Sequence, residues 1–201
     1  MPTNRISRRD VAAILGASAL SCVLATGEED PKNDGARWMD QWIKEGRAPA
    51  GGLYLGRFAD PIYFLTQPIT WMPNKGQERH HGVTAPKGFV TDLASIPRPF
   101  WSLLRPDGLY AYAAILHDYL YWFQTRPREE CDMILKFGME DFGVDKATVT
   151  IIYQAVRKGG GVAWADNARL RKSGESRILK NFPEDPRTRW DSWKKIRENF
   201  E

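Results

Sequence analysis

The chain has 201 residues, of which 42% are apolar and 27% charged. These values resemble those of globular proteins, so they exclude wholesale disorder and predict about one folded domain. The net charge is +4, and half of this excess lies in the first ten residues, so charge gives no argument for nucleic-acid binding. The two cysteines, one of them Cys22, can build neither a disulfide framework nor a cysteine zinc site. No apolar run reaches the ~18 residues of an ordinary membrane span.

The N-terminal segment has the layout of an export signal. Residues 1–10 are basic, residues 11–25 form an almost uncharged apolar run, and the chain then becomes acidic. The motif Ser7-Arg8-Arg9-Asp10-Val11 is similar to a twin-arginine signal. We therefore predict export to the periplasm or the outside of the cell, with residues 1–25 as the signal. The alternatives are a lipid anchor through Cys22 and a cytosolic protein with an apolar N-terminal helix.

The next part of the chain is predicted to form strands. Residues 26–51 have the composition of a linker, with a short amphipathic helix over Ala36–Gly46. Three segments rich in β-branched and aromatic residues and bounded by Gly and Pro predict strands over Gly52–Arg57, Ile62–Trp71 and Gly88–Asp92. Strands this short predict a small antiparallel sheet.

From Leu109 onward the apolar residues recur at helical spacing. The predicted helices span Leu109–Phe123, Arg128–Phe142 and Lys146–Lys158. We interpret Gly159-Gly160-Gly161 as a C-cap and turn that ends the third helix, because a phosphate-binding loop would open a helix instead. The predicted fold class is α+β, with a small antiparallel sheet packed against a three-helix array.

A charged, helical C-terminal extension is predicted over residues 166–201, beyond a core domain at residues 52–165. Its aromatic and aliphatic residues predict a last amphipathic helix that packs back on the core. These residues are Trp190, Trp193, Ile196 and Phe200.

The strongest candidate for chemistry lies in the first long helix. His117 and Tyr121 are four residues apart and share a face that is otherwise apolar. A tight connection at residues 124–127 would make an antiparallel hairpin in which Asp132 of the next helix faces His117. A carboxylate bonded to one imidazole nitrogen fixes the tautomer and leaves the other nitrogen as a general base. We therefore predict His117 as the base, oriented by Asp132 and Tyr121.

Two further carboxylates are predicted at the edge of this site. Asp118 projects from the edge of the buried helix face, where it could hold a hard cation such as calcium. Asp92, in the turn after the third strand, would supply a second carboxylate. The alternatives here are that Thr91 or Asp92 caps a short helix, with Ser95 behind it. Ser95 as a nucleophile is a further alternative, although no Gly-x-Ser-x-Gly elbow surrounds it.

Two other candidates are interpreted as structural. His80 and His81 are expected in an exposed, solvated loop, because nothing near them in sequence supplies further zinc ligands. Cys131 is predicted to be a small core residue.

Paired signatures in the chain resemble domain of unknown function family 1353. The first signature runs from Gly88 to Trp101. The second joins Tyr110-x-x-Ala-Ala-Ile-Leu-His-Asp-Tyr-Leu-Tyr to Arg128-x-x-Cys-Asp. The resemblance covers roughly residues 52–161. It implies that related proteins are encoded in phages and prophages, but it implies no particular activity. The predicted leader and the charged extension of this chain argue against a phage role.

A shorter pattern, His117-Asp118-x-x-Tyr121 with Cys131-Asp132 on the following helix, is similar to secreted phospholipase A₂. The resemblance implies that His117 activates a water, that Asp118 binds calcium, and that Asp132 and Tyr121 orient His117. The glycine-rich calcium loop and the linking disulfides of those enzymes are missing from this sequence.

Two classes of function follow from these patterns. The first is an exported, lipase- or esterase-like hydrolase, with or without calcium. Its substrate would be a small molecule or a lipid, its membrane contact only peripheral, and no nucleic acid is expected. The second is a non-catalytic structural or binding protein, phage-derived or envelope-associated, in which His117 and Asp132 brace the fold. An enzyme needs His117 and Asp118 at the floor of an open pocket, whereas a brace can be fully buried.

Overall fold

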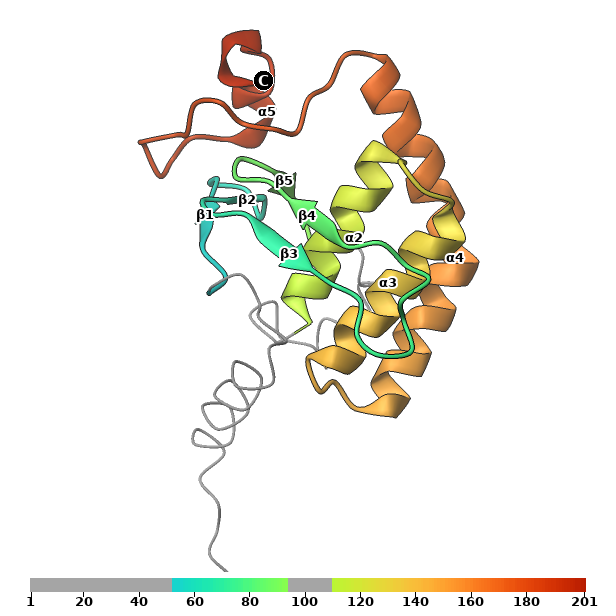
Figure 1. Ribbon diagram of the computed structural model, residues 1–201. Helices are drawn as coiled ribbons and strands as arrows, with labels where there is room; N and C mark the ends of the chain where they lie inside the picture. Colours follow the sequence, from blue (N-terminus) through green and yellow to red (C-terminus); the bar gives the residue numbers. More distant parts are fainter. Residues whose placement is uncertain (1–51, 94–109) are drawn as a thin grey trace, which may run out of the picture. The chain divides into compact units, whose positions relative to one another are not determined.

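The computed structural model describes residues 52–93 and 110–201 (Figure 1). Their strands form two small antiparallel sheets. The first sheet has the order β1-β2-β5, and the second pairs β3 with β4. The strands are β1 (Leu55–Arg57), β2 (Tyr63–Leu65), β3 (Ile69–Trp71), β4 (Val83–Ala85) and β5 (Val90–Thr91).

The predicted strand over Ile62–Trp71 is two strands, one in each sheet. Pro68 precedes β3, and proline cannot donate a hydrogen bond to a sheet ladder, so it separates β2 from β3. Strand β4 is absent from the sequence prediction. Its three residues alternate buried, exposed and buried, which is too short a pattern to stand out from the surrounding loop.

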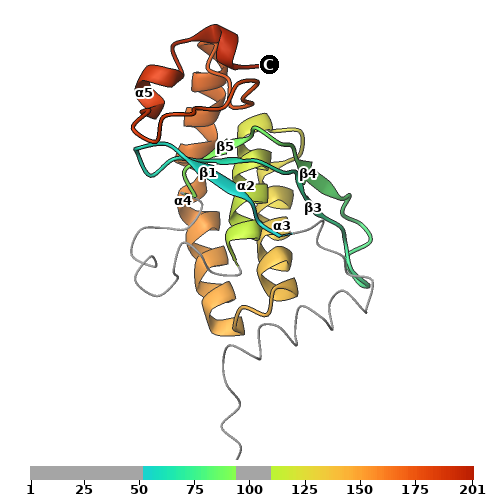
Figure 2. The same ribbon diagram turned by 90° about the vertical axis from the view of Figure 1, so that its left-hand side faces the viewer.

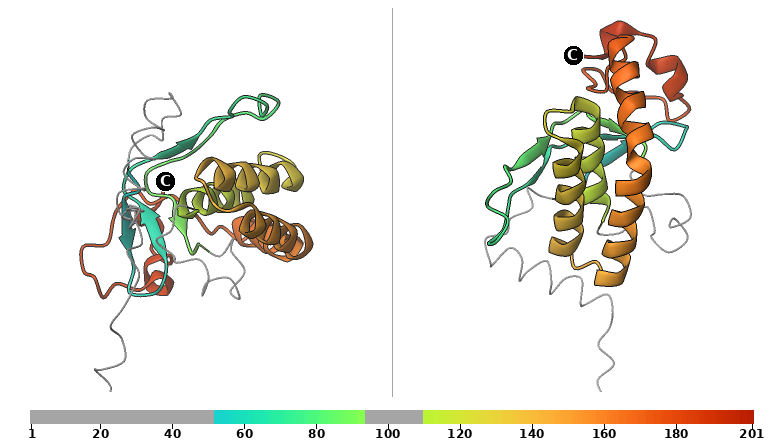
Figure 3. Two further views of the ribbon diagram at one scale, coloured as in Figure 1. Left: turned by 90° about the horizontal axis from the view of Figure 1, so that it is seen from below. Right: turned by 90° about the vertical axis from the view of Figure 1, so that its right-hand side faces the viewer.

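Three helices follow the strands, as the sequence predicts. They are α2 (Ala111–Phe123), α3 (Arg128–Asp141) and α4 (Lys146–Lys172). They run side by side, which the views along and across their axes show (Figures 2 and 3). Helix α2 contacts both other helices and also β3, β4 and β5, so it joins the helices to the strands.

The predicted end of the third helix at Lys158 is wrong, because α4 continues through the three glycines to Lys172. Tertiary contacts explain the difference. Arg171 donates hydrogen bonds to the carbonyls of Trp122 and Phe123 at the end of α2, and Gln124 donates to the carbonyl of Trp164. These contacts hold the second half of α4 against α2 and offset the helix cost of glycine, about 1 kcal/mol per residue relative to alanine.

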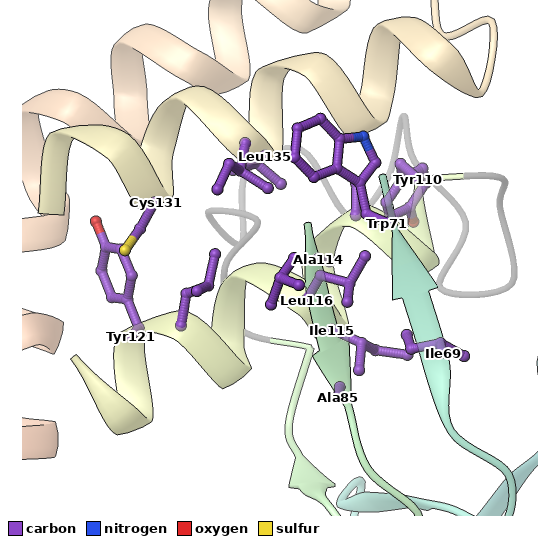
Figure 4. Close-up of a cluster of buried hydrophobic side chains, with 14 of the residues drawn as sticks. Ile69, Trp71, Ala85, Tyr110, Ala114, Ile115, Leu116, Tyr121, Cys131 and Leu135 are labelled. Atoms are coloured by element: carbon purple, nitrogen blue, oxygen red, sulfur yellow. The ribbon is translucent and has the colours of Figure 1, made fainter. Parts of the chain in front are cut away.

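The main apolar core lies where α2 meets α3 and the strands. Figure 4 shows side chains from these elements together, among them Ile69 of β3, Ala85 of β4, Ile115 of α2 and Leu135 of α3. Cys131 is fully buried in this core, which confirms its predicted structural role.

The C-terminal segment packs on a second apolar cluster and pairs with the body of the fold. The predicted single helix is instead a four-residue helix, α5 (Trp190–Trp193), and a 3₁₀ turn at Arg197–Asn199. Trp190 contributes to the second cluster, and Ile178 forms a backbone bridge with Phe89. The fold class is α+β, as predicted: small antiparallel sheets, three packed helices and a C-terminal segment.

Several expectations lie outside the described residues, namely the export signal, the helix over Ala36–Gly46 and the turn that contains Ser95. Among the described residues, no helix is long and apolar enough to cross a membrane. The expectation that His80 is solvated is wrong, because its side chain is buried and packs edge-on against Phe137 of α3, with ring centroids 5.3 Å apart.

Candidate functional site

The predicted helix hairpin brings His117, Tyr121 and Asp132 into contact. The Nε2 atom of His117 lies 3.0 Å from Oδ1 of Asp132, and the Tyr121 hydroxyl donates a hydrogen bond to the same oxygen. His117 and Asp132 are both buried, with 1% and 0% of their area exposed. The connection between α2 and α3 is short because Gln124 ends α2 in a left-handed conformation and Pro127 precedes α3.

Two arginines bind the other oxygen of Asp132. Arg128, four residues earlier on α3, donates from Nη1 at 3.1 Å, and Arg157 of α4 donates from Nη1 at 2.9 Å. Sequence reasoning missed both. The spacing of Arg128 and Asp132 is that of a helical ion pair and could have revealed the first. Nothing local indicates Arg157, which reaches the site because α4 packs on α3.

The environment keeps Asp132 ionised and His117 neutral. Burial raises the pKa of Asp132, but hydrogen bonds from His117, Tyr121 and Arg157 outweigh this effect and hold the pKa below its ordinary value. Burial lowers the pKa of His117 below its ordinary value of 6.5, although the Asp132 carboxylate opposes the shift. Burial also raises the pKa of Tyr121, so its hydroxyl stays protonated and donates to Asp132.

A cavity of about 320 Å³ adjoins this network. His117, Asp118 and Tyr121 of α2 line it, together with Asp92 after β5, one face of α4 and Arg177. The five side chains predicted for the site, Asp92 and Asp132 included, therefore lie in or beside one cavity. Its volume lies at the lower end of the range for ligand pockets, ~300–1,000 Å³, which suits a small ligand.

Asp118 is tied to the strand that precedes Asp92. The hydroxyl of buried Thr91 donates to Oδ2 of Asp118 and accepts a hydrogen bond from the backbone N–H of Leu93. Calcium takes six to eight oxygen ligands. Within residues 52–93 and 110–201, no group of three or more His, Cys, Asp or Glu side chains is placed to hold a metal ion. Calcium also accepts backbone and amide oxygens as ligands, so its binding by Asp118 and Asp92 stays a prediction, and we derive no chemical step through the ion.

Gly160 of α4 allows Tyr121 to reach Asp132. A Cβ atom built at Gly160 would lie 2.4 Å from the Tyr121 hydroxyl oxygen, far inside van der Waals contact, whereas one built at Gly161 meets nothing within 4 Å. The glycine run that predicted a helix end therefore gives close helix packing at one position.

We expect Gly160→Ala to lower the free energy of unfolding by about 1–3 kcal/mol, because the added methyl group displaces Tyr121 or separates the helices. Gly161→Ala is the matched control and should raise the free energy of unfolding by about 0.5–1 kcal/mol through helix propensity alone. Urea denaturation measures both, and equal effects of the two substitutions would contradict the packing role of Gly160.

Residues 69–156 match the family described as protein of unknown function (DUF1353). This match confirms the resemblance carried by the signatures around His117 and covers the elements from β3 to the first half of α4. Uncharacterized protein y4jT of Sinorhizobium fredii (strain NBRC 101917 / NGR234) is 32% identical over 77 residues, which are 37% of this chain and 23% of that protein. The chain thus spans less than a quarter of that relative's length. No solved structure matches the chain significantly.

Proposed function

We propose that this chain is an exported hydrolase in which His117 activates water at the floor of the cavity. The observation that carries the proposal is the hydrogen bond between His117 and the buried Asp132 carboxylate, beside a cavity of ligand size. His117 and Asp118 both line this cavity, which supports an enzyme over a brace, and Asp92 lines it as well. Export rests on the predicted leader alone.

The protonation states of Asp132 and His117 determine which imidazole nitrogen can accept a proton. An ionised carboxylate only accepts hydrogen bonds, so the imidazole proton lies on Nε2 and is donated to Asp132. The lone pair of His117 then lies on Nδ1. Because burial holds the pKa of His117 below 6.5, the imidazole is neutral at pH 7 and can take a proton.

The reaction we propose is hydrolysis of an ester of small size. Nδ1 of His117 takes a proton from water as the water oxygen attacks the carbonyl carbon. The tetrahedral intermediate then breaks its bond to the alkoxy oxygen, which receives the proton from His117. The products are a carboxylic acid and an alcohol. Asp132 and Tyr121 are positioning residues in this scheme, since they hold the imidazole ring and its tautomer.

A second function is favoured by the number of groups that Asp132 binds. Its carboxylate accepts hydrogen bonds from residues of all three helices: His117 and Tyr121 of α2, Arg128 of α3 and Arg157 of α4. A buried carboxylate with partners on all three helices can serve solely to hold the helices together. In that case the chain is a non-catalytic structural or binding protein, phage-derived or envelope-associated.

The pH dependence of hydrolysis separates these functions. The purified protein would be assayed with p-nitrophenyl esters, a phosphodiester and phospholipid vesicles, each with calcium and with a chelator. We expect kcat/KM for a small ester to be constant above neutral pH and to fall in acid, with an apparent pKa below 6.5, because protonated His117 cannot accept a proton. Turnover of none of these substrates would favour the non-catalytic brace, and loss of activity with chelator would support the predicted role of calcium.

A further inference from the structure

Arg177 is a cationic side chain in the same cavity, and the proposed reaction leaves it without a role. It follows α4 and lies outside the segment that matches the family. Its place in the fold is nevertheless fixed. The backbone N–H of Val90 donates to the carbonyl oxygen of Arg177 at 2.8 Å, and Ile178 forms the backbone bridge with Phe89. Arg177 is therefore held beside β5, the strand that leads to Asp92.

The guanidinium group of Arg177 is oriented by the indole ring of Trp122. Its central carbon lies 4.3 Å from the ring centroid, a cation–π distance, and Nε donates to Glu175 at 3.5 Å. The side chain is 17% exposed. Trp122 is buried on α2, four residues after Asp118 and so on the same side of the helix. These contacts fix the guanidinium plane and leave its two terminal nitrogens without a hydrogen bond to any residue that the structure describes.

Asn167 of α4 lines the same cavity, and its side-chain amide also makes no hydrogen bond within the described residues. A guanidinium with two unused nitrogens and a carboxamide therefore contribute donors to one cavity. The carboxylates of Asp92 and Asp118 line it as well, and they disfavour a further negative charge near them. Arg177 is the cationic side chain among the described residues that line the cavity, so it offers an anionic group the attraction that offsets this repulsion.

We propose that Arg177, with Asn167, binds an oxyanion of the substrate, so that the substrate is a small ester that carries a carboxylate or a phosphate group. The inference rests on the proposed hydrolase function and deepens it. A guanidinium presents its donors in a planar fork that matches the two oxygens of a carboxylate or phosphate. The anion held at Arg177 orients the ester bond for attack by the water that His117 activates.

The kinetic test compares a p-nitrophenyl ester that has a free terminal carboxylate, its phosphate counterpart and the neutral methyl ester of the first. We expect the intact protein to prefer a charged ester, and Arg177→Gln to reduce the ratio of charged to neutral kcat/KM by about 10- to 100-fold, as for a charge-assisted hydrogen bond. Arg177→Lys keeps the charge but loses the fork, so it should reduce the ratio less. Arg169→Gln, at an exposed position on α4 outside the cavity, is the matched control and should leave the ratio unchanged.

A binding measurement keeps this inference distinct from the proposed function. Acetate and inorganic phosphate would be titrated by calorimetry into the intact protein, Arg177→Gln and Asn167→Ala. Binding that Arg177→Gln abolishes, in a protein that hydrolyses no ester, would support the anion site and remove the hydrolase. Ester hydrolysis with the same charged-to-neutral ratio in Arg177→Gln would keep the hydrolase and overturn the anion site. If Arg177→Gln unfolds because Trp122 loses its partner, Arg177→Lys and Asn167→Ala decide by the same measurements.

Discussion

Replacing His117 with glutamine is expected to lower the rate of ester hydrolysis by about 10²- to 10⁴-fold, the usual share of a positioned general base. The glutamine amide can still donate a hydrogen bond to Asp132, so the helix hairpin should keep most of its stability. An amide cannot take a proton from water at neutral pH, so the chemistry is lost while the fold remains. The measurements are kcat/KM with a small p-nitrophenyl ester and the urea unfolding midpoint.

The matched control for this substitution is His80→Gln. His80 is also buried, but it packs against Phe137 and does not line the cavity of His117. Its replacement should leave the rate of ester hydrolysis unchanged, although it can lower the free energy of unfolding because the side chain is buried. The opposite result for His117→Gln, a loss of stability in a protein that shows no hydrolysis before or after the change, would identify the His117–Asp132 pair as a brace.

Local patterns in the sequence were enough to predict the two helices that carry the site. The apolar period predicts α2 and α3 to within a few residues, and the tight connection between them predicts that His117 faces Asp132. This pair could be predicted because one short hairpin determines it. The roles of the two side chains in catalysis stay predictions.

The remaining parts of the site depend on contacts between segments far apart in the chain. Arg157 reaches Asp132 only because α4 packs on α3, and Arg177 enters the cavity only because the segment after α4 pairs with β5. The glycine run is the clearest case. By local propensity it ends a helix, whereas contacts of α4 with the end of α2 keep the helix intact through Gly160. No local pattern contains that information.

Replacing Asp132 with asparagine is expected to lower the free energy of unfolding by about 3–5 kcal/mol, the usual cost of removing one partner from a buried ion pair. Asparagine has nearly the same shape, so the change removes the charge and leaves no cavity. Arg128 and Arg157 would then face a neutral amide at about 3 Å. One half of that amide is itself a donor and would face either the arginines or the pair formed by His117 and Tyr121.

Asp141→Asn on the same helix is the matched control. Asp141 accepts hydrogen bonds from Trp71 and Gln77 and is only half-buried, so its replacement should lower the free energy of unfolding by about 0.5–1.5 kcal/mol.

The pH dependence of the free energy of unfolding gives a second test of the role of Asp132. Because the folded pKa of Asp132 lies below its ordinary value of 3.8, its contribution to stability is present above that pH and is lost as the pH falls through the folded value. The difference between the intact protein and Asp132→Asn in urea unfolding should therefore be largest near neutral pH and shrink below about pH 4. A cost no greater than that of Asp141→Asn at pH 7 would show that Asp132 neither braces the helices nor holds His117 in place.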